Sequence, residues 1–213
     1  MSKVQVKICG ITNWTDAQRA VEAGVQFLGF NFYRPSPRYI RPALARQIIR
    51  RLPERIRAVG VFVNETEANM LAIAKRVGLD YLQLHGDEQP DQVARLKRKI
   101  PVIKAVRVRD SFRQKHLDSF GRASAILLDG FDARHHGGTG KTFNWRLARG
   151  SSGSRRIFLA GGLTPENVAE AIRVVHPYAV DVCSGVEAHP GRKDPARIVA
   201  LMWAVKTAEA KDK

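Results

Sequence analysis

The chain has 213 residues, of which 44% are hydrophobic and 26% are charged, and its formal net charge is +16 at pH 7. This composition is typical of a folded globular protein and excludes a collagen-like or disordered chain. The longest stretch without a charged residue, 23–33, is too short for a transmembrane helix, which needs about 20 residues. The N-terminus has no signal-peptide pattern and two cysteines cannot form a disulfide framework, so we expect a cytoplasmic protein.

The excess of basic residues raises the possibility of nucleic-acid binding. Much of it lies in residues 34–57 and 95–115. Neither segment alternates aromatic with basic residues, as a surface that stacks single-stranded bases does. We therefore interpret the charge as solvated helix faces and expect no nucleic-acid or membrane partner, while a basic nucleic-acid-binding protein stays an alternative.

Short runs of β-branched and apolar residues, each of a length suited to a strand, recur along the chain. They occupy residues 4–10, 26–32, 57–63, 81–86, 102–108, 125–130, 156–162 and 179–185. The segments between and after them carry apolar residues at helical spacing, at 16–24, 44–52, 68–78, 90–99, 144–148, 166–175 and 196–208, with a weaker pattern at 111–120. Strands that alternate with helices in this way form a parallel sheet.

Eight strand–helix units of about 25 residues each match the count and size of a (β/α)8 barrel. We therefore predict an α/β fold: a TIM barrel with a parallel eight-stranded sheet, as a single domain over residues 1–213. A doubly wound open sheet is the alternative, although such sheets more often have five or six strands. Two helices are expected to begin after Thr164 and Asp194, because proline follows each of them directly.

Polar residues stand at the ends of several predicted strands, where the active sites of such barrels lie. They are Lys7, Cys9, Gln83, His85, Asp129, Asp181 and Cys183. The alternation of a strand places each of them opposite its apolar neighbours, toward the barrel interior. Because an unsatisfied buried polar group costs free energy, a ring of such groups at one end indicates a site.

Glycine-rich turns follow the seventh and eighth predicted strands. Gly161 and Gly162 lie in the first turn, and Ser184 and Gly185 in the second. These two loops hold a phosphate group in many barrels of this kind, on backbone N–H groups. The segment 137–142, GGTGKT, lacks the first glycine and the strand–helix context of a nucleotide-binding P-loop, so we interpret it as a glycine-rich active-site loop.

Several motifs, in register with the predicted barrel, resemble those of phosphoribosylanthranilate isomerases of tryptophan biosynthesis. They are KICGIT (7–12), SPRYI (36–40), GVFVN (60–64), QLHG (83–86), GGTGKTF (137–143), GGL (161–163), NV (167–168) and DVCSGVE (181–187). The resemblance runs from residue 4 to about residue 195. It implies a (β/α)8 barrel with no metal and no cofactor. It also implies the Amadori rearrangement of a small molecule, N-(5-phosphoribosyl)anthranilate, to 1-(2-carboxyphenylamino)-1-deoxyribulose 5-phosphate.

The resemblance also implies a role for each site residue. Cys9 would be the general base and Asp129 the general acid. The substrate would contact Lys7, Arg38, His85 and Asp181, with Arg38 on the anthranilate carboxylate and Asp181 near the ribose. Its phosphate would bind Gly161, Gly162, Ser184 and Gly185. We also expect the protein to be a monomer, as most mesophilic relatives are.

Other phosphate-binding barrels stay open as alternatives. Indole-glycerol-phosphate synthase would need catalytic lysine and glutamate residues, ribulose-phosphate epimerase a His/Asp metal set, and the bifunctional histidine/tryptophan isomerase an aspartate in place of Cys9.

Two residues depart from the usual pattern of the phosphoribosylanthranilate isomerases: Ala160 and Cys183. Since strands one and eight are neighbours in a closed barrel, we expect the thiols of Cys9 and Cys183 to lie close together, within reach of an oxidative crosslink.

Overall fold

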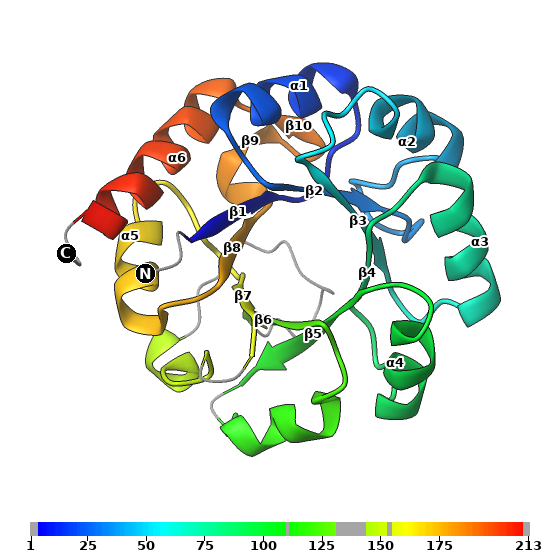
Figure 1. Ribbon diagram of the computed structural model, residues 1–213. Helices are drawn as coiled ribbons and strands as arrows, with labels where there is room; N and C mark the ends of the chain where they lie inside the picture. Colours follow the sequence, from blue (N-terminus) through cyan, green and yellow to red (C-terminus); the bar gives the residue numbers. More distant parts are fainter. Residues whose placement is uncertain (1–3, 110, 131–143, 153–154, 211–213) are drawn as a thin grey trace.

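The fold is a closed barrel of eight parallel strands surrounded by helices (Figure 1). The computed structural model describes residues 4–109, 111–130, 144–152 and 155–210. The strands are β1 (Gln5–Ile8), β2 (Phe27–Asn31), β3 (Arg57–Phe62), β4 (Tyr81–Leu84), β5 (Val102–Val108), β6 (Ala125–Gly130), β7 (Ile157–Leu159) and β8 (Ala179–Val182). Strand β1 pairs with both β2 and β8, which closes the barrel. The predicted TIM barrel is confirmed and the open sheet is excluded.

In the part of the chain that the structure describes, six α-helices form most of the outer ring. They are α1 (Trp14–Ala23), α2 (Pro42–Ile49), α3 (Glu67–Val77), α4 (Pro90–Lys97), α5 (Val168–Val175) and α6 (Pro195–Ala210). After β5 and β6 the chain instead forms the short 3-10 helices η1 (Gln114–Phe120) and η2 (Trp145–Ala148). Only Leu117 of η1 and Ala148 of η2 are buried, so these segments have little apolar surface to stabilise an α-helix. The helical pattern at 144–148 and the weaker one at 111–120 thus correspond to 3-10 helices and not to α-helices.

The two predicted helix starts had different outcomes. The side chain of Asp194 accepts hydrogen bonds from the backbone of Ala196 at 2.8 Å and Arg197 at 3.3 Å, which confirms it as the cap of α6. Thr164 does not cap α5. Residues 165–167 form a turn, in which the Asn167 side chain accepts from the backbone N–H of Thr164 at 2.8 Å. This turn delays the start of α5 to Val168.

The loop after β8 contains structure that the sequence did not indicate. A 3-10 turn, η3 (Ser184–Val186), leads into two short antiparallel strands, β9 (Glu187–His189) and β10 (Arg192–Lys193). The sequence pattern predicts a strand to residue 185, but β8 (Ala179–Val182) ends at Val182. The consequence for the site is that Glu187 and Lys193 are brought back beside the end of β8.

The barrel interior contains apolar side chains along part of its axis and polar side chains at the strand ends. One cluster of buried apolar residues fills part of it, with Phe27 of β2 contacting Phe158 of β7 at a ring-centroid distance of 5.2 Å and Tyr81 of β4 at 6.0 Å. A larger cluster packs the strands against the helices. Buried polar side chains, among them Lys7, Gln83, Asp129 and Asp181, belong to the same strands. The apolar layers thus support a polar layer at the strand ends.

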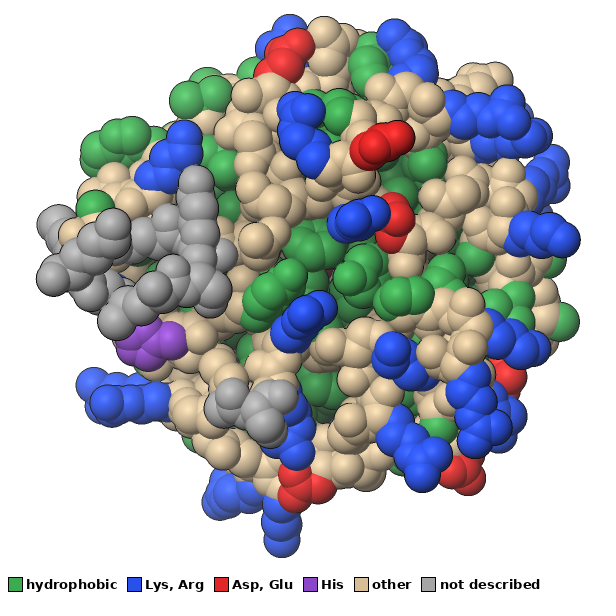
Figure 2. All heavy atoms as spheres, viewed as in Figure 1, with side chains coloured by type: hydrophobic (Ala, Val, Ile, Leu, Met, Phe, Trp, Pro, Cys, Tyr) green, Lys and Arg blue, Asp and Glu red, His purple; other side chains and the backbone are tan. Residues whose placement is uncertain are grey.

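The surface shows how the positive charge is distributed. On the face in Figure 2, Lys and Arg side chains lie along the edges and also near the middle, where hydrophobic side chains gather. None of the helices in the described part of the chain is long and apolar enough to cross a membrane.

Candidate active site

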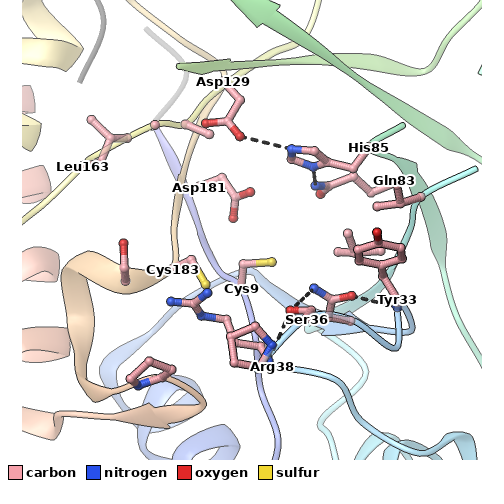
Figure 3. A pocket seen from close by; sticks show the side chains of 18 of the residues that line it. Cys9, Tyr33, Ser36, Arg38, Gln83, His85, Asp129, Leu163, Asp181 and Cys183 are labelled. Atoms are coloured by element: carbon pink, nitrogen blue, oxygen red, sulfur yellow. Dashed lines mark hydrogen bonds and ion pairs between the residues drawn. The ribbon is translucent and has the colours of Figure 1, made fainter. Parts of the chain in front are cut away.

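A pocket of about 490 Å³ lies where the strand ends meet. Most of the predicted site residues line it: Cys9, Arg38, His85, Asp129, Gly161, Gly162, Asp181 and Ser184. Two predicted residues, Lys7 and Gly185, do not line the pocket but lie behind its wall. Figure 3 shows that the labelled side chains come from opposite sides of the barrel and point into one space.

Lys7 and Asp181 form an ion pair between neighbouring strands. They are opposite each other in the β1–β8 register, and the Lys7 Nζ lies 2.8 Å from one carboxylate oxygen and 2.9 Å from the other. The Lys7 side chain is fully buried. Burial opposes its charge, but Asp181 and Cys9 outweigh this effect and raise the pKa of Lys7 above its ordinary value. Lys7 is therefore placed to support Asp181 and Cys9.

Cys9 lies beside the Lys7 ammonium group. A side-chain carbon added at Gly29 of β2 would lie 2.7 Å from the Cys9 Sγ and 3.1 Å from the Lys7 Nζ, so this glycine provides the room for both groups. The pKa of Cys9 is well below its ordinary value: a hydrogen bond from the Cys183 thiol lowers it most, and the charges of Lys7 and Lys193 also lower it, against the opposing effect of burial. A thiolate at Cys9 has the character of a base.

Arg38, in the loop after β2, is held by Glu187. Its Nε lies 2.9 Å and 3.1 Å from the two carboxylate oxygens and its Nη2 lies 2.7 Å from one of them, which is a bidentate pair. The Lys193 Nζ contacts the same carboxylate at 2.9 Å. Burial opposes the charge of Arg38, but Glu187 outweighs it and raises the pKa of the guanidinium group. Among the described residues, Arg38 Nη1 has no hydrogen-bond partner, and Arg38 lines the pocket.

His85 connects Asp129 to Gln83 (Figure 3). Its Nε2 lies 3.1 Å from Asp129 Oδ2, and its Nδ1 lies 2.8 Å from Gln83 Nε2. All three side chains are buried. The structure thus places the predicted contact residue His85 against the predicted acid Asp129, where it fixes the direction of the carboxyl group.

The loops after β7 and β8 pack directly on each other. Gly161 and Gly162 have φ angles of 85° and 62°, a region that favours glycine. The Asn167 side chain donates to the Gly162 carbonyl at 2.9 Å, which holds this turn. At Gly185 a side-chain carbon would overlap the carbonyl oxygen of Leu163, so only glycine allows this contact. The two loops offer backbone N–H groups at one end of the pocket.

Three residues of the site were not assigned a role from the sequence. Glu187 belongs to the family-like motif 181–187, and Gln83 is a polar residue at the end of a predicted strand. Lys193 has no sequence signal of its own that indicates a site. Glu187 and Lys193 reach the site through the β9–β10 hairpin. The predicted active-site loop at 137–142 lies outside the described residues. Among the residues described, no group of three or more metal-ligating side chains is gathered.

Comparison with known proteins gives one consistent result. Residues 6–204 match the family model of N-(5'phosphoribosyl)anthranilate (PRA) isomerase. An N-(5'-phosphoribosyl)anthranilate isomerase of Moorella thermoacetica is 52% identical over 97% of this chain and 91% of its own. The crystal structure of phosphoribosyl anthranilate isomerase from Thermus thermophilus superposes with a TM-score of 0.88 at 36% identity, covering 96% of this chain and 99% of that one. Another, of phosphoribosyl anthranilate isomerase in complex with reduced 1-(o-carboxyphenylamino)-1-deoxyribulose 5-phosphate, has a TM-score of 0.83 at 42% identity with the same coverage.

Proposed function

This chain belongs to the N-(5'-phosphoribosyl)anthranilate isomerase family, and from that premise we propose that Cys9 and Asp129 are the two groups that transfer protons in its reaction. The chain is an isomerase of tryptophan biosynthesis, as its family match shows. The observation that carries the proposal is that one pocket contains a cysteine, a carboxyl group, an arginine and two glycine-rich loops. Each matches one part of an anionic, phosphorylated substrate.

The binding step follows from the positions of the charges. The phosphate of the substrate binds the backbone N–H groups of the loops that contain Gly161, Gly162, Ser184 and Gly185. The anthranilate carboxylate binds the open side of the Arg38 guanidinium group, which Glu187 holds in place. The ribose then lies between these two anchors, next to Cys9, Asp129 and Asp181. The anchors supply the orientation that the proton transfers need.

The first chemical step opens the ribose ring. Asp129 gives its proton to the ring oxygen as the bond between that oxygen and C1 breaks, and the nitrogen lone pair forms the Schiff base. The proton that Asp129 gives to the ring oxygen is on one carboxyl oxygen, while the other, Oδ2, accepts a hydrogen bond from the His85 Nε2–H. The Nδ1 of the neutral His85 ring then accepts from the Gln83 side-chain amide nitrogen.

The second step removes the proton from C2. The Cys9 thiolate takes this proton, the electron pair forms the C1–C2 double bond, and the iminium nitrogen becomes neutral. Loss of the C2 hydroxyl proton and gain of a proton at C1 complete the ketone. The sequence of steps is an internal rearrangement that consumes no other reagent. It needs a base on one side of the sugar and an acid on the other. Cys9, directly after β1, is the proposed base, and Asp129 in β6 is the proposed acid.

The proposal is tested by the isomerase activity of Cys9→Ala and Asp129→Asn variants, because each removes one proton-transfer group and keeps the fold. The expectation of a monomer also stays a prediction, which light scattering in solution tests: a mass of 23.8 kDa supports it and twice that mass contradicts it.

A further inference from the structure

We propose that Cys183 is a positioning residue for this reaction, whose thiol donates a hydrogen bond to the Cys9 sulfur and keeps it as an oriented thiolate. The inference rests on the proposed role of Cys9 as the base. It assigns a task to a second cysteine that the steps above do not use.

The barrel register brings the two cysteines together. Ile8 of β1 pairs with Val182 of β8, and the backbone N–H of Cys9 donates to the carbonyl of Val182 at 2.9 Å. Cys9 and Cys183 are the next residues along these adjacent strands. Both line the pocket, and Figure 3 shows their sulfur atoms near each other between Asp181 and Arg38. The expected proximity of the two thiols is confirmed.

Cys183 is itself held in place. The Lys193 Nζ lies 3.1 Å from its carbonyl oxygen and 3.9 Å from its sulfur. The thiol has one hydrogen to donate and two acceptors beside it: the Glu187 Oε1, to which it makes a long contact of 3.9 Å, and the Cys9 sulfur. That carboxylate already accepts from Arg38 and Lys193. The Cys9 thiolate is therefore the acceptor that benefits more from the Cys183 hydrogen.

Of the two thiols, Cys9 is the one that ionises and Cys183 is the one that stays neutral. The charged groups that face the two thiols are Lys7 from β1, Arg38 from the loop after β2, Asp181 from β8, Glu187 from β9 and Lys193 from β10. The hydrogen bond to Cys9 raises the pKa of Cys183 well above its ordinary value, and burial raises it further. Cys183 accordingly keeps its hydrogen over the pH range in which Cys9 loses its own.

The test compares Cys183→Ala, which removes the donor, with Cys183→Ser, which keeps a hydroxyl donor in its place. Because the chain has two cysteines, each variant contains Cys9 as its only thiol. The Cys9 thiolate is titrated by its ultraviolet absorbance and by the rate of iodoacetamide alkylation against pH, with the alkylated peptide identified by mass. The pH profile of kcat/KM is measured on the same three proteins.

We expect Cys183→Ala to raise the Cys9 titration midpoint by about one pH unit, which is a roughly tenfold loss of thiolate at pH values below the midpoint. The acidic limb of kcat/KM should move with it, and Cys183→Ser should stay close to the wild type in both. Equal shifts in the two variants would reduce Cys183 to a packing residue, and an unchanged midpoint in Cys183→Ala would overturn the proposal. If the midpoint shifts but the kcat/KM profile does not, the role of Cys9 as base fails instead.

Discussion

The Nζ of Lys7 and the Oδ1 of Asp181 lie 2.8 Å apart on neighbouring strands, with Asp181 lining the pocket and Lys7 fully buried beside it. Two effects compete at Asp181. Burial favours its neutral form, while Lys7 favours the carboxylate, and burial is the larger effect because the pKa of Asp181 is raised to about 6. Lys7 has the opposite balance and keeps its charge. The buried ammonium group of Lys7 thus interacts with two acidic groups, those of Asp181 and Cys9.

The raised pKa of Asp181 predicts a particular pH dependence of stability. Between its ordinary value of 3.8 and about 6, the folded protein holds a proton at Asp181 that the unfolded chain has lost. This contribution is fully present below the lower value and is lost as the pH rises through the higher one, at about 1.4 kcal/mol for each unit of pKa difference. Asp181→Asn removes this titration. In urea unfolding from pH 4 to pH 7.5, the free energy of unfolding of the wild type should fall relative to that of Asp181→Asn. If the wild-type value minus the variant value stays constant or increases with pH, the prediction is contradicted.

The position of Arg38 predicts a binding defect in its variants. Arg38→Lys keeps the charge but loses the fork that contacts Glu187 on one side and, in the proposed binding mode, the substrate carboxylate on the other. We expect KM to rise by about tenfold to thirtyfold with a small change in kcat, since loss of a buried, charge-assisted contact costs roughly 2 kcal/mol. Steady-state kinetics give both values. The control is Arg57→Lys on the exposed pair with Asp80, which should behave as the wild type. An unchanged KM in Arg38→Lys would exclude this carboxylate contact.

His85 is predicted to act mainly through Asp129. His85→Asn removes the ring that contacts Asp129 Oδ2 at 3.1 Å and leaves the carboxyl group free to turn. The expected result is a fall in kcat of about tenfold to a hundredfold, because a misdirected acid loses much of the gain from general acid catalysis. KM should change little. A raised KM with a normal kcat would show instead that His85 contacts the substrate and does not orient the acid.

The proximity of the two cysteines predicts a crosslink under oxidation. A peroxide converts one thiolate to a sulfenic acid, which condenses with the neighbouring thiol to a disulfide and water. We expect loss of activity, loss of two hydrogens in the intact mass and a crosslinked Cys9–Cys183 peptide, all reversed by a thiol reductant. Cys183→Ser should give no crosslink and a more highly oxidised Cys9. Oxidation of wild-type Cys9 without any such peptide would show that the geometry forbids the bond.

Periodicity was sufficient to predict the barrel. Each of the eight strands overlaps its predicted run, because a fully buried parallel strand needs a continuous apolar segment and the helices between strands need a different period. The same alternation placed Cys9, Asp129 and Asp181 at the pocket, since consecutive residues of a strand point to opposite sides. The chemistry of these residues, in contrast, came from the family resemblance.

What could not be predicted depends on contacts between distant segments. Lys193 is 10 residues from Cys183 in the sequence, and its contact with that residue depends on the β9–β10 hairpin, for which short polar segments give no periodic signal. Lys7 was expected in contact with the substrate, but the strand register buries it against Asp181. The bidentate pair of Arg38 and Glu187, 149 residues apart, has the same origin.

The most direct test of the account is the rate of isomerisation of freshly generated phosphoribosylanthranilate, followed by loss of substrate fluorescence with EDTA present. The wild type should turn over, and Cys9→Ala and Asp129→Asn should each lose at least about a hundredfold in kcat while their circular dichroism spectra stay unchanged. Turnover by Cys9→Ala within tenfold of the wild type would place the base elsewhere. Normal turnover by Asp129→Asn would do the same for the acid.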